Sequence, residues 1–345
     1  MAISMDELQL ATRNHGMPLE ALRYDVTPVG LHYLLVHFDV PAVPEDWRLH
    51  VGGLVSRELT LSQDELRERP SVRRIVTMEC AGNGRARLEP RIVSQPWIAE
   101  AIGTGEWGGV ELAPLLREAG MGDGAVEVLF TGLDRGIDGG VEQAYERSLS
   151  LDEALAGDAL LAYELNGEPL PPQHGAPLRL VVPGWYGMTS VKWLERIRVL
   201  DRPFDGYQQA HAYRFRRDED DEGEPVARMR PRSLMLPPGV PDFMTRRRFV
   251  EAGPCSLEGR AWSGVAPIES VEVGVDGEWA TARVEPAPDR FAWSRWTFHW
   301  QAEPGDHELA CRARDEAGNE QPLEPEWNVG GYCNNAAQSL AVTVR

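Results

Sequence analysis

Hydrophobic and polar positions follow mixed periods in the first two hundred residues. Arg74–Met78 and Val126–Phe130 are short runs with many β-branched and aromatic residues, which is typical of strands. Within 61–66 a serine is followed three residues later by a glutamate, the capping-box signature of a short helix. Leu112–Ala119, followed by Gly120, predicts another helix with a glycine stop. Because strands and helices do not alternate regularly, the pattern predicts an α+β domain rather than a doubly wound parallel sheet.

From about Pro225 onward the pattern changes to short alternating runs separated by turns. The predicted strands are Val271–Val275, Phe291–Trp293, Trp296–Trp300, Leu309–Ala313 and Leu340–Val344. Asp276-Gly277 and Pro304-Gly305 supply turns between them. This pattern indicates an antiparallel β-sandwich of immunoglobulin type.

An acidic segment, Arg217–Glu224, separates the two patterns and is expected to be an exposed connection. A chain of 345 residues is also too long for one ordinary core. We therefore predict two domains, residues 1–222 and residues 223–345.

Charge narrows the classes of partner. The chain has 35 Lys plus Arg against 54 Asp plus Glu, a net charge of −19, which disfavours binding to nucleic acid and to anionic membrane surfaces. An anionic substrate would need a site that gathers its own basic residues. The N-terminal residues show no basic region followed by an apolar run, and no stretch reaches the length of a membrane span, so we expect a cytoplasmic protein.

The cysteines are scattered, with no Cys-x-x-Cys pair to suggest a zinc ribbon or a redox disulfide. The informative one is Cys80, in the segment Thr77–Arg85, where a strand runs into a turn of small residues. Glycines there let the backbone approach a ligand, and Arg85 would favour the thiolate. A buried structural cysteine fits the same spacing equally well.

A second informative segment, Pro171–Trp193, combines glycine and proline turns with His174, Arg179, Ser190 and Lys192. Such turns suit a phosphate or a polar heterocycle, through backbone N–H groups and charge-assisted contacts. The alternative is a pair of solvated turns. The convergence of several cations in an acidic protein favours a binding site.

Several segments together resemble the sulfite oxidase family of molybdopterin oxidoreductases. They are Cys-Ala-Gly-Asn83, Ile102–Gly109, Leu161–Pro171, His174–Arg179 and Val191–Leu194, in the family's order and at similar spacing. Further on, Gly259–Gly264 and Trp327–Gly331 resemble the family's C-terminal, immunoglobulin-like dimerisation domain. The resemblance runs from about Val26 to the end of the chain.

The resemblance implies a molybdenum ion bound by one pterin dithiolene and by Cys80, and a soft thiolate suits such a metal. By the same matching, the pterin and its phosphate would be held by Asn14, Tyr33, His37, Asp134, His174, Arg179, Ser190, Val191 and Lys192. Tyr213 matches the family's active-site tyrosine, while Arg85 and Trp97 match its anion pocket, with Arg295 a further candidate cation. As isolated aromatics, Tyr213 and Trp97 could equally be core residues.

One position departs from the family. Its sulfite oxidases have an arginine two residues before the histidine matched by His37, and Leu35 stands there in this chain. An Arg13-Asn-His15 segment exists, but it lies too far from Cys80 in sequence to correspond simply. This difference affects the prediction of which substrate the protein binds, but it leaves the prediction of the cofactor unchanged.

The sequence leaves three functions open. The first is oxidation of sulfite to sulfate by a homodimer, with electrons passed to a cytochrome, to another separate acceptor or to oxygen; Trp293 or Trp296 would contribute to the dimer contact. The second is reduction of a sulfoxide or another oxo-donor, which the missing arginine favours and the appended sandwich disfavours. The third, a non-catalytic cofactor carrier or scaffold, is disfavoured because Cys80, Tyr213 and Arg85 are all retained.

Overall fold

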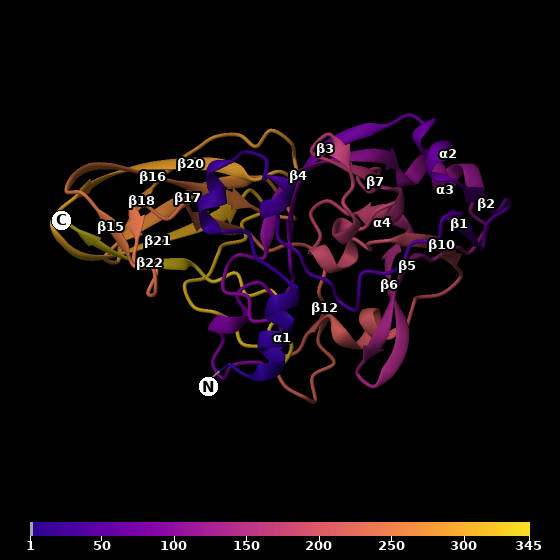
Figure 1. Cartoon of the computed structure of the whole chain (residues 1–345), viewed down its shortest axis with the longest axis horizontal. Helices are drawn as coiled ribbons and strands as arrows, with labels where there is room; N and C mark the ends of the chain where they lie inside the picture. The colour runs from indigo at the N-terminus through magenta and orange to yellow at the C-terminus, as the bar shows by residue number, and fades with distance from the viewer. Residues whose placement is uncertain (1–2) are drawn as a thin grey trace.

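Two β-sheets form the N-terminal part of the chain, which extends to the right in Figure 1. The computed structural model describes residues 3–345. One sheet has the order β2 (Leu59–Leu61), β1 (Leu49–Gly53), β10 (Leu194–Leu200), β5 (Glu127–Asp138) and β6 (Val141–Ser150). The other has the order β3 (Val72–Glu79), β4 (Ile102–Glu111), β7 (Leu160–Leu165) and β8 (Glu168–Pro169), with β9 (Arg179–Val181) also paired to β7. Strands β1 and β10 run parallel, and the other pairs in these sheets are antiparallel.

The helices of this part are short. In residues 3–345 the α-helices are α1 (Met5–Arg13), α2 (Gln63–Arg67), α3 (Leu112–Ala119) and α4 (Leu151–Leu155). The predicted capping box is confirmed, because the Ser62 hydroxyl accepts from the Glu65 N–H and the Glu65 carboxylate accepts from the Ser62 N–H. The predicted α3 is also confirmed and ends at Gly120, whose φ of +68° favours glycine. The region is therefore richer in sheet than the α+β prediction suggests.

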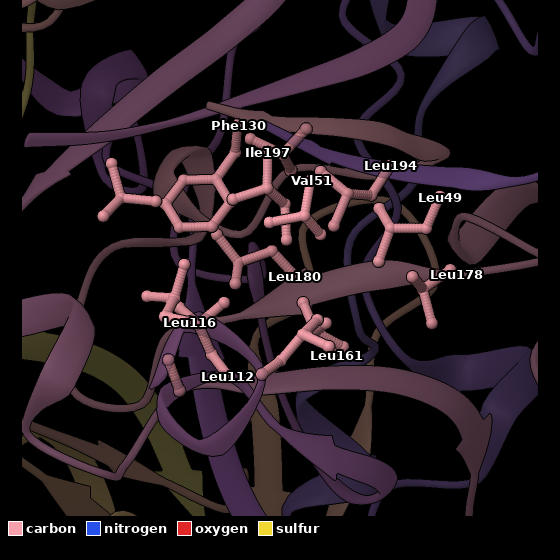
Figure 2. Close-up of a cluster of buried hydrophobic side chains, with 14 of the residues drawn as sticks. Leu49, Val51, Leu112, Leu116, Phe130, Leu161, Leu178, Leu180, Leu194 and Ile197 are labelled. Atoms are coloured by element: carbon pink, nitrogen blue, oxygen red, sulfur yellow. The ribbon is translucent and has the colours of Figure 1, made fainter. Parts of the chain in front are cut away.

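The main core of this part lies between its two sheets and α3. It is mostly aliphatic and well shielded from water, so it fixes the sheets relative to each other. Figure 2 shows the labelled members Leu49, Val51, Leu112, Leu116, Phe130, Leu161, Leu178, Leu180, Leu194 and Ile197.

Two further sheets face each other in the C-terminal part, at left in Figure 1. One has the order β13 (Arg232–Met235), β16 (Gly253–Trp262), β20 (Ser294–Ala302) and β19 (Arg283–Val284). The other has the order β14 (Val240–Pro241), β15 (Arg248–Val250), β22 (Gln338–Val344), β21 (Gly305–Asp315), β17 (Ile268–Val275) and β18 (Glu278–Thr281). The predicted strands over 271–275, 296–300, 309–313 and 340–344 are confirmed, as is the turn at Asp276-Gly277.

The predicted strand over Phe291–Trp293 is wrong. This segment is a turn, in which the carbonyl and the carboxylate of Asp289 accept hydrogen bonds from the Ala292 and Phe291 N–H groups. Phe291 belongs to the cluster that also contains Cys80, whereas Trp293 belongs to another cluster. The apolar alternation therefore reflects two separate contacts and not the two faces of a strand.

The acidic connection is exposed, as predicted. It forms the loop between β11 (Arg214–Phe215) and β12 (Glu224–Pro225), which pair as a short hairpin. An apolar cluster then joins the two parts of the chain, with Met17 and Tyr213 on one side and Leu234 and Trp262 on the other. The two parts consequently share buried surface near the candidate site.

The suggested place of Trp293 or Trp296 in a dimer contact is wrong. Trp293 is 2% exposed, and Trp296 is fully buried in the core of the C-terminal part. Neither side chain can reach a partner subunit without unfolding its own core.

Candidate active site

The chain turns sharply at the end of β3, and Cys80 lies at that turn. The strand becomes fully buried over its last four residues, and Cys80 itself is 8% exposed. A Cβ on Gly82 would lie 2.8 Å from the Arg85 guanidinium, and Gly84 has a φ of +90°. Both glycines are therefore needed to bring Arg85 back toward the cysteine.

A buried carboxylate fixes this turn from behind. Glu79 accepts hydrogen bonds from Asn83 Nδ2 at 2.9 Å, from Arg232 Nη1 at 2.8 Å and from Trp262 Nε1 at 2.9 Å. Glu79 is 1% exposed, so these bonds replace all of its hydration. Since Arg232 and Trp262 belong to β13 and β16, the C-terminal part helps to hold Cys80 in place.

Two cavities meet at Cys80. The inner cavity has about 70 Å³ of open space and is lined by Tyr33, Leu35, His37, Cys80, Asp134, His174, Arg179, Ser190, Lys192 and Tyr213, with His32, Leu34, Met78, Tyr145, Gly187 and Met188. The outer cavity, a cleft of about 660 Å³, shares Leu35, His37, Cys80 and Tyr213 with it. Cys80 can therefore contact a group that spans both spaces.

Most of the residues predicted for the cofactor surround the inner cavity. They are Tyr33, His37, Asp134, His174, Arg179, Ser190 and Lys192. Asn14, Arg85 and Trp97 line the outer cleft instead. Val191 lines neither cavity, because its side chain is fully buried in the main core and its N–H and carbonyl form hydrogen bonds with Thr189 and Leu180.

Two cations define the charge of the inner cavity, the buried Arg179 and the partly buried Lys192. The Arg179 guanidinium donates to the carbonyls of His174 and Ser190, and Lys192 Nζ donates to the carbonyl of Leu35 at 2.8 Å. Among residues 3–345, no carboxylate forms an ion pair with either cation. Burial lowers the pKa of Lys192 to about 7 and that of Arg179 to about 10. An anionic ligand would stabilise both charges.

Neutral polar groups complete the inner cavity. Burial lowers the pKa of His32 to about 4 and that of His174 to about 2, so both rings are neutral at neutral pH. Burial also raises the pKa of Asp134 to about 6. His32 Nε2 and Asp134 Oδ1 are buried without a hydrogen-bond partner in the described part of the chain. Such atoms suit the polar edge of a bound heterocycle.

Two opposing influences act on the pKa of the Cys80 thiol. Burial raises its pKa, whereas the charge of Arg85, the Gly82 N–H and the Trp97 indole favour the thiolate. The Trp97 indole nitrogen nevertheless makes no hydrogen bond of normal geometry with the described residues. Coordination of a soft metal would remove the thiol proton.

Arg85 is held rigidly at the edge of the cleft. Its Nε donates to the Gly330 carbonyl at 3.0 Å, its Nη1 donates to Ser94 Oγ at 2.9 Å, and its guanidinium lies 5.0 Å from the centre of the Tyr332 ring. It is 6% exposed and has no carboxylate ion-pair partner among residues 3–345. The charge of Arg85 therefore remains available to an anion in the cleft.

Tyr213 lines both cavities together with Cys80. It follows a π-helical turn, Gln208–Ala212, and its ring is tilted by 36° against the Tyr332 ring, with ring centres 5.2 Å apart. Burial raises its pKa well above the usual tyrosine value, so the phenol remains a hydrogen-bond donor. Arg147 lies over its ring at 5.4 Å and donates to the Gln208 carbonyl. The π-helical turn is thereby fixed beside the site.

Sequence reasoning missed several residues that line these cavities. They are His32 and Tyr145 in the inner cavity and Gln95, Asp138, Tyr207, His211 and Tyr332 in the cleft. His32 directly precedes Tyr33, which was predicted to bind the cofactor, so its position in the sequence could have identified it as a lining residue. Tyr332 gave no such signal, because it is brought to the cleft by folding. The suggestion that Arg295 lines the anion pocket is wrong, since it pairs with Glu258 on the surface of the C-terminal sheets.

These residues fit a molybdenum-bound pterin with a phosphate. Arg179 and the partly buried Lys192, which have no carboxylate partner within residues 3–345, suit the phosphate, and the unpartnered atoms of His32 and Asp134 suit the pterin ring. Within residues 3–345, no three His, Cys, Asp or Glu side chains converge on a metal site made of protein alone. One cysteine with a cofactor ligand agrees with that finding.

Comparison with known proteins points to the same chemistry. Residues 37–208 match the oxidoreductase molybdopterin binding domain, and residues 232–345 match the Mo-co oxidoreductase dimerisation domain. The chain is 36% identical to sulfite oxidase of Gallus gallus over 90% of this chain and 72% of that protein. It is 34% identical to mitochondrial sulfite oxidase of Mus musculus over 92% of this chain, but it spans just 62% of that protein.

Two other proteins extend the comparison. An NADH nitrate reductase of Brassica napus is 32% identical over 93% of this chain and 39% of that protein. The solved structure of the sulfane dehydrogenase SoxCD from Paracoccus pantotrophus aligns with a TM-score of 0.81 and 28% identity, covering 96% of this chain and 86% of that one. The chain therefore belongs to the sulfite oxidase family of molybdopterin oxidoreductases.

Proposed function

We propose that this protein oxidises a small sulfur oxyanion, sulfite, to sulfate and passes the electrons to a separate acceptor. The observation that carries the proposal is the cleft beside Cys80, whose lining includes Arg13, Arg85, Arg135 and Arg216. Arg135 and Arg216 pair with Glu195 and Glu219, whereas Arg13 and Arg85 form no carboxylate ion pair within residues 3–345. In a chain with a net charge of −19, these two cations provide a local site for an anion. The sulfite oxidases of Gallus gallus and Mus musculus, similar over nine tenths of this chain, support the same substrate.

The residues of this chain would hold the cofactor and orient the anion. Cys80 would bind the metal, while Arg179 and Lys192 would hold the phosphate. The bound cofactor supplies the two-electron chemistry. Arg85, fixed by Gly330, would hold the substrate's oxygen atoms by charge-assisted hydrogen bonds. The reaction balances as sulfite plus water giving sulfate, two protons and two electrons.

Tyr213 would supply a neutral hydrogen bond on the other side of the substrate. Its raised pKa keeps the phenol protonated, and the Tyr332 ring and Arg147 restrict its movement. A fixed donor at this place stabilises charge that develops on oxygen without a reorganisation cost.

A second candidate function, reduction of an oxo-donor such as a sulfoxide, is favoured by one observation. Leu35 lines both cavities beside Cys80, so the cleft has an apolar residue where the family's sulfite oxidases place an arginine. A neutral substrate would not need that charge. Because the chain is also similar to a nitrate reductase, the experiment below tests for reduction as well as for oxidation.

We further propose a homodimer formed by the C-terminal part, in agreement with the dimerisation domain matched by residues 232–345. Its two facing sheets support an immunoglobulin-type sandwich, and the exposed hairpin loop supports a boundary between residues 222 and 223. In residues 3–345 no helix is long and apolar enough to cross a membrane. A cytoplasmic location stays a prediction. Light scattering that finds just a 38.4 kDa species at micromolar concentration would contradict the dimer.

Metal analysis followed by a sulfite-dependent assay tests the function. We expect one molybdenum per chain and sulfite-dependent reduction of cytochrome c or of a dye. Turnover of a sulfoxide with reduced dye, in the absence of sulfite oxidation, would favour the reductase function instead. Full metal occupancy with neither reaction would contradict both.

A further inference from the structure

The outer cleft is larger than sulfite requires. Its volume of about 660 Å³ corresponds to roughly twenty water molecules at about 30 Å³ each. Sites of about 300–1,000 Å³ usually take drug-sized molecules. The metal end of the cofactor would occupy the region next to Cys80, and the rest of the cleft continues to the β5–β6 hairpin. A four-atom anion leaves most of that remainder filled with water.

The far wall of the cleft is partly apolar. Phe38, Ile137 and Tyr207 line it, and Ile137 is 72% exposed. Phe38 and Tyr207 pack against Gly136 and Gly139 of the β5–β6 hairpin, where any added Cβ would clash with their rings. These contacts hold the aromatic rings at the hairpin. An exposed apolar surface inside a cleft is typical of a ligand site.

The lining near Cys80 includes one charged and one apolar side chain. Arg85 lines the cleft with its guanidinium fixed by the Gly330 carbonyl and by Ser94. Leu35 lines the same cleft and packs against the apolar cluster that contains Cys80 and Trp97. A substrate that fits has oxygen atoms on its Arg85 side and an apolar substituent on its Leu35 side. Sulfite, with three equivalent oxygen atoms, can use the charged part of this lining but has no group for the apolar part.

We propose that the cleft takes organic sulfinates, R–SO₂⁻, and that the enzyme oxidises them to sulfonates. This inference rests on the proposed function, because a sulfinate keeps the sulfur lone pair and the anionic oxygens of sulfite. Its organic group replaces one oxygen and extends past Leu35 toward Ile137 and Tyr207. Arg13, which also lines the cleft, suits a second anionic group on that substituent.

The reaction balances in the same way as sulfite oxidation. A sulfinate plus water gives a sulfonate, two protons and two electrons, so one S–O bond forms and the carbon–sulfur bond stays intact. Sulfur is oxidised by two electrons, and two equivalents of a one-electron acceptor, such as cytochrome c or ferricyanide, are reduced. The new oxygen comes from water.

The test compares sulfite, methanesulfinate and benzenesulfinate with the molybdenum-loaded enzyme and ferricyanide as acceptor. We expect kcat/KM for benzenesulfinate to exceed that for methanesulfinate by about tenfold or more, equivalent to about 1.4 kcal/mol. Titration calorimetry gives a second readout, because the product analogue benzenesulfonate should bind more tightly than methanesulfonate.

Two variants on one hairpin locate the organic group. Ile137→Ser should lower the ratio of the benzenesulfinate and methanesulfinate kcat/KM values by roughly threefold or more, since it removes apolar contact. Val141→Ser is the matched control, because Val141 is exposed on the same hairpin and outside the cleft lining. It should leave that ratio unchanged. Leu35→Arg should raise kcat/KM for sulfite and lower it for benzenesulfinate.

The failures are distinguishable. Oxidation of sulfite without a preference for benzenesulfinate over methanesulfinate would overturn this inference and leave the proposed function standing. Oxidation of neither sulfite nor any sulfinate by the metal-loaded enzyme would overturn both. An equal effect of Ile137→Ser and Val141→Ser would also overturn the proposed binding of the organic group at the hairpin.

Discussion

At the scale of single residues, Cys80 is the group on which the candidate site depends. We expect Cys80→Ser to fold like the parent protein, because a hydroxyl is close in size to the thiol. It should lose molybdenum and turnover, since a hydroxyl is a poorer ligand for a soft metal than a thiolate. Metal analysis beside thermal unfolding checks both parts. Cys255→Ser is the control, because Cys255 lies half-buried at the start of β16. Retention of full activity in Cys80→Ser would contradict the assignment.

Arg85 carries the second prediction at this scale. A hydrogen bond to a charged group contributes about 1.5–3 kcal/mol, and each 1.4 kcal/mol is about a tenfold change in affinity. With Leu35 in place of a second arginine, Arg85→Ala should raise the KM for sulfite by roughly ten- to a hundredfold and change kcat less. The KM of the parent should also rise with salt, and that of the variant should rise less. An unchanged KM would show that Arg13, Arg135 or Arg216 binds the anion instead.

Which residues could be predicted from sequence follows from how far apart they lie in the chain. Cys80, Arg179 and Lys192 occur in compact segments whose spacing is visible, and the structure brings all three to one cavity. Their roles in cofactor binding stay predictions. Tyr332 meets Arg85 across about two hundred and fifty positions, so no local pattern could have revealed it.

At the scale of elements, the sequence predicts those helices and strands that are stabilised by contacts between residues close together in the chain. The strand β3 and the helix α3 follow from side-chain periodicity and a glycine stop, and both occur as predicted. The π-helical turn before Tyr213 had no signal, because it is held by Arg147, which comes from β6. Elements of this kind are fixed by distant contacts.

The helix α1 gives a prediction about pH. Glu7 is fully buried and accepts two hydrogen bonds of 2.7 Å from the Arg91 guanidinium, which lower the pKa of its carboxyl to about 2. The unfolded chain would have the usual value of about 4.3. This pair therefore stabilises the fold fully above about pH 4.5, and its contribution is lost as the pH falls toward 2.

Glu7→Gln should accordingly have a lower melting temperature than the parent at pH 7, and the difference should shrink as the pH approaches about 3. Thermal unfolding across that range measures the difference. Arg91→Met should show the same loss of pH dependence, because it removes the other partner. A difference that stays constant from neutral to acid pH would contradict the assigned role of the pair.

At the scale of the whole molecule, the two parts of the chain are coupled around the site. Arg85 Nε donates a hydrogen bond to the Gly330 carbonyl, and Asn334 Nδ2 donates to the Gly84 carbonyl at 2.8 Å. Both contacts join the Cys80 turn to a segment that sequence analysis assigned to the C-terminal domain alone. The sequence predicts two domains. It does not show that both of them hold the Cys80 turn, because these contacts form only in the tertiary fold.

The ion pair between Arg232 and Glu79 is the centre of that coupling and carries the last prediction. Both side chains are at most 5% exposed, and their atoms Nη1 and Oε1 lie 2.8 Å apart. Removing one partner of a buried pair costs about 3–5 kcal/mol, because the other charge is left without compensation. Arg232→Met should therefore lower the free energy of unfolding by about that amount. It should also reduce molybdenum content, since Glu79 directly precedes Cys80.

Two controls make this prediction specific to the buried pair. Arg230→Met removes a surface ion pair with Glu326, whose atoms lie 3.4 Å apart, and should cost about 0–1 kcal/mol. The double variant Glu79→Gln with Arg232→Met leaves no unpaired charge and should be less destabilised than the sum of the single variants. A single unfolding transition is expected in every case, because the apolar cluster around Trp262 belongs to both parts. If Arg232→Met unfolds one part in a separate early transition, the two parts are less coupled than these contacts imply.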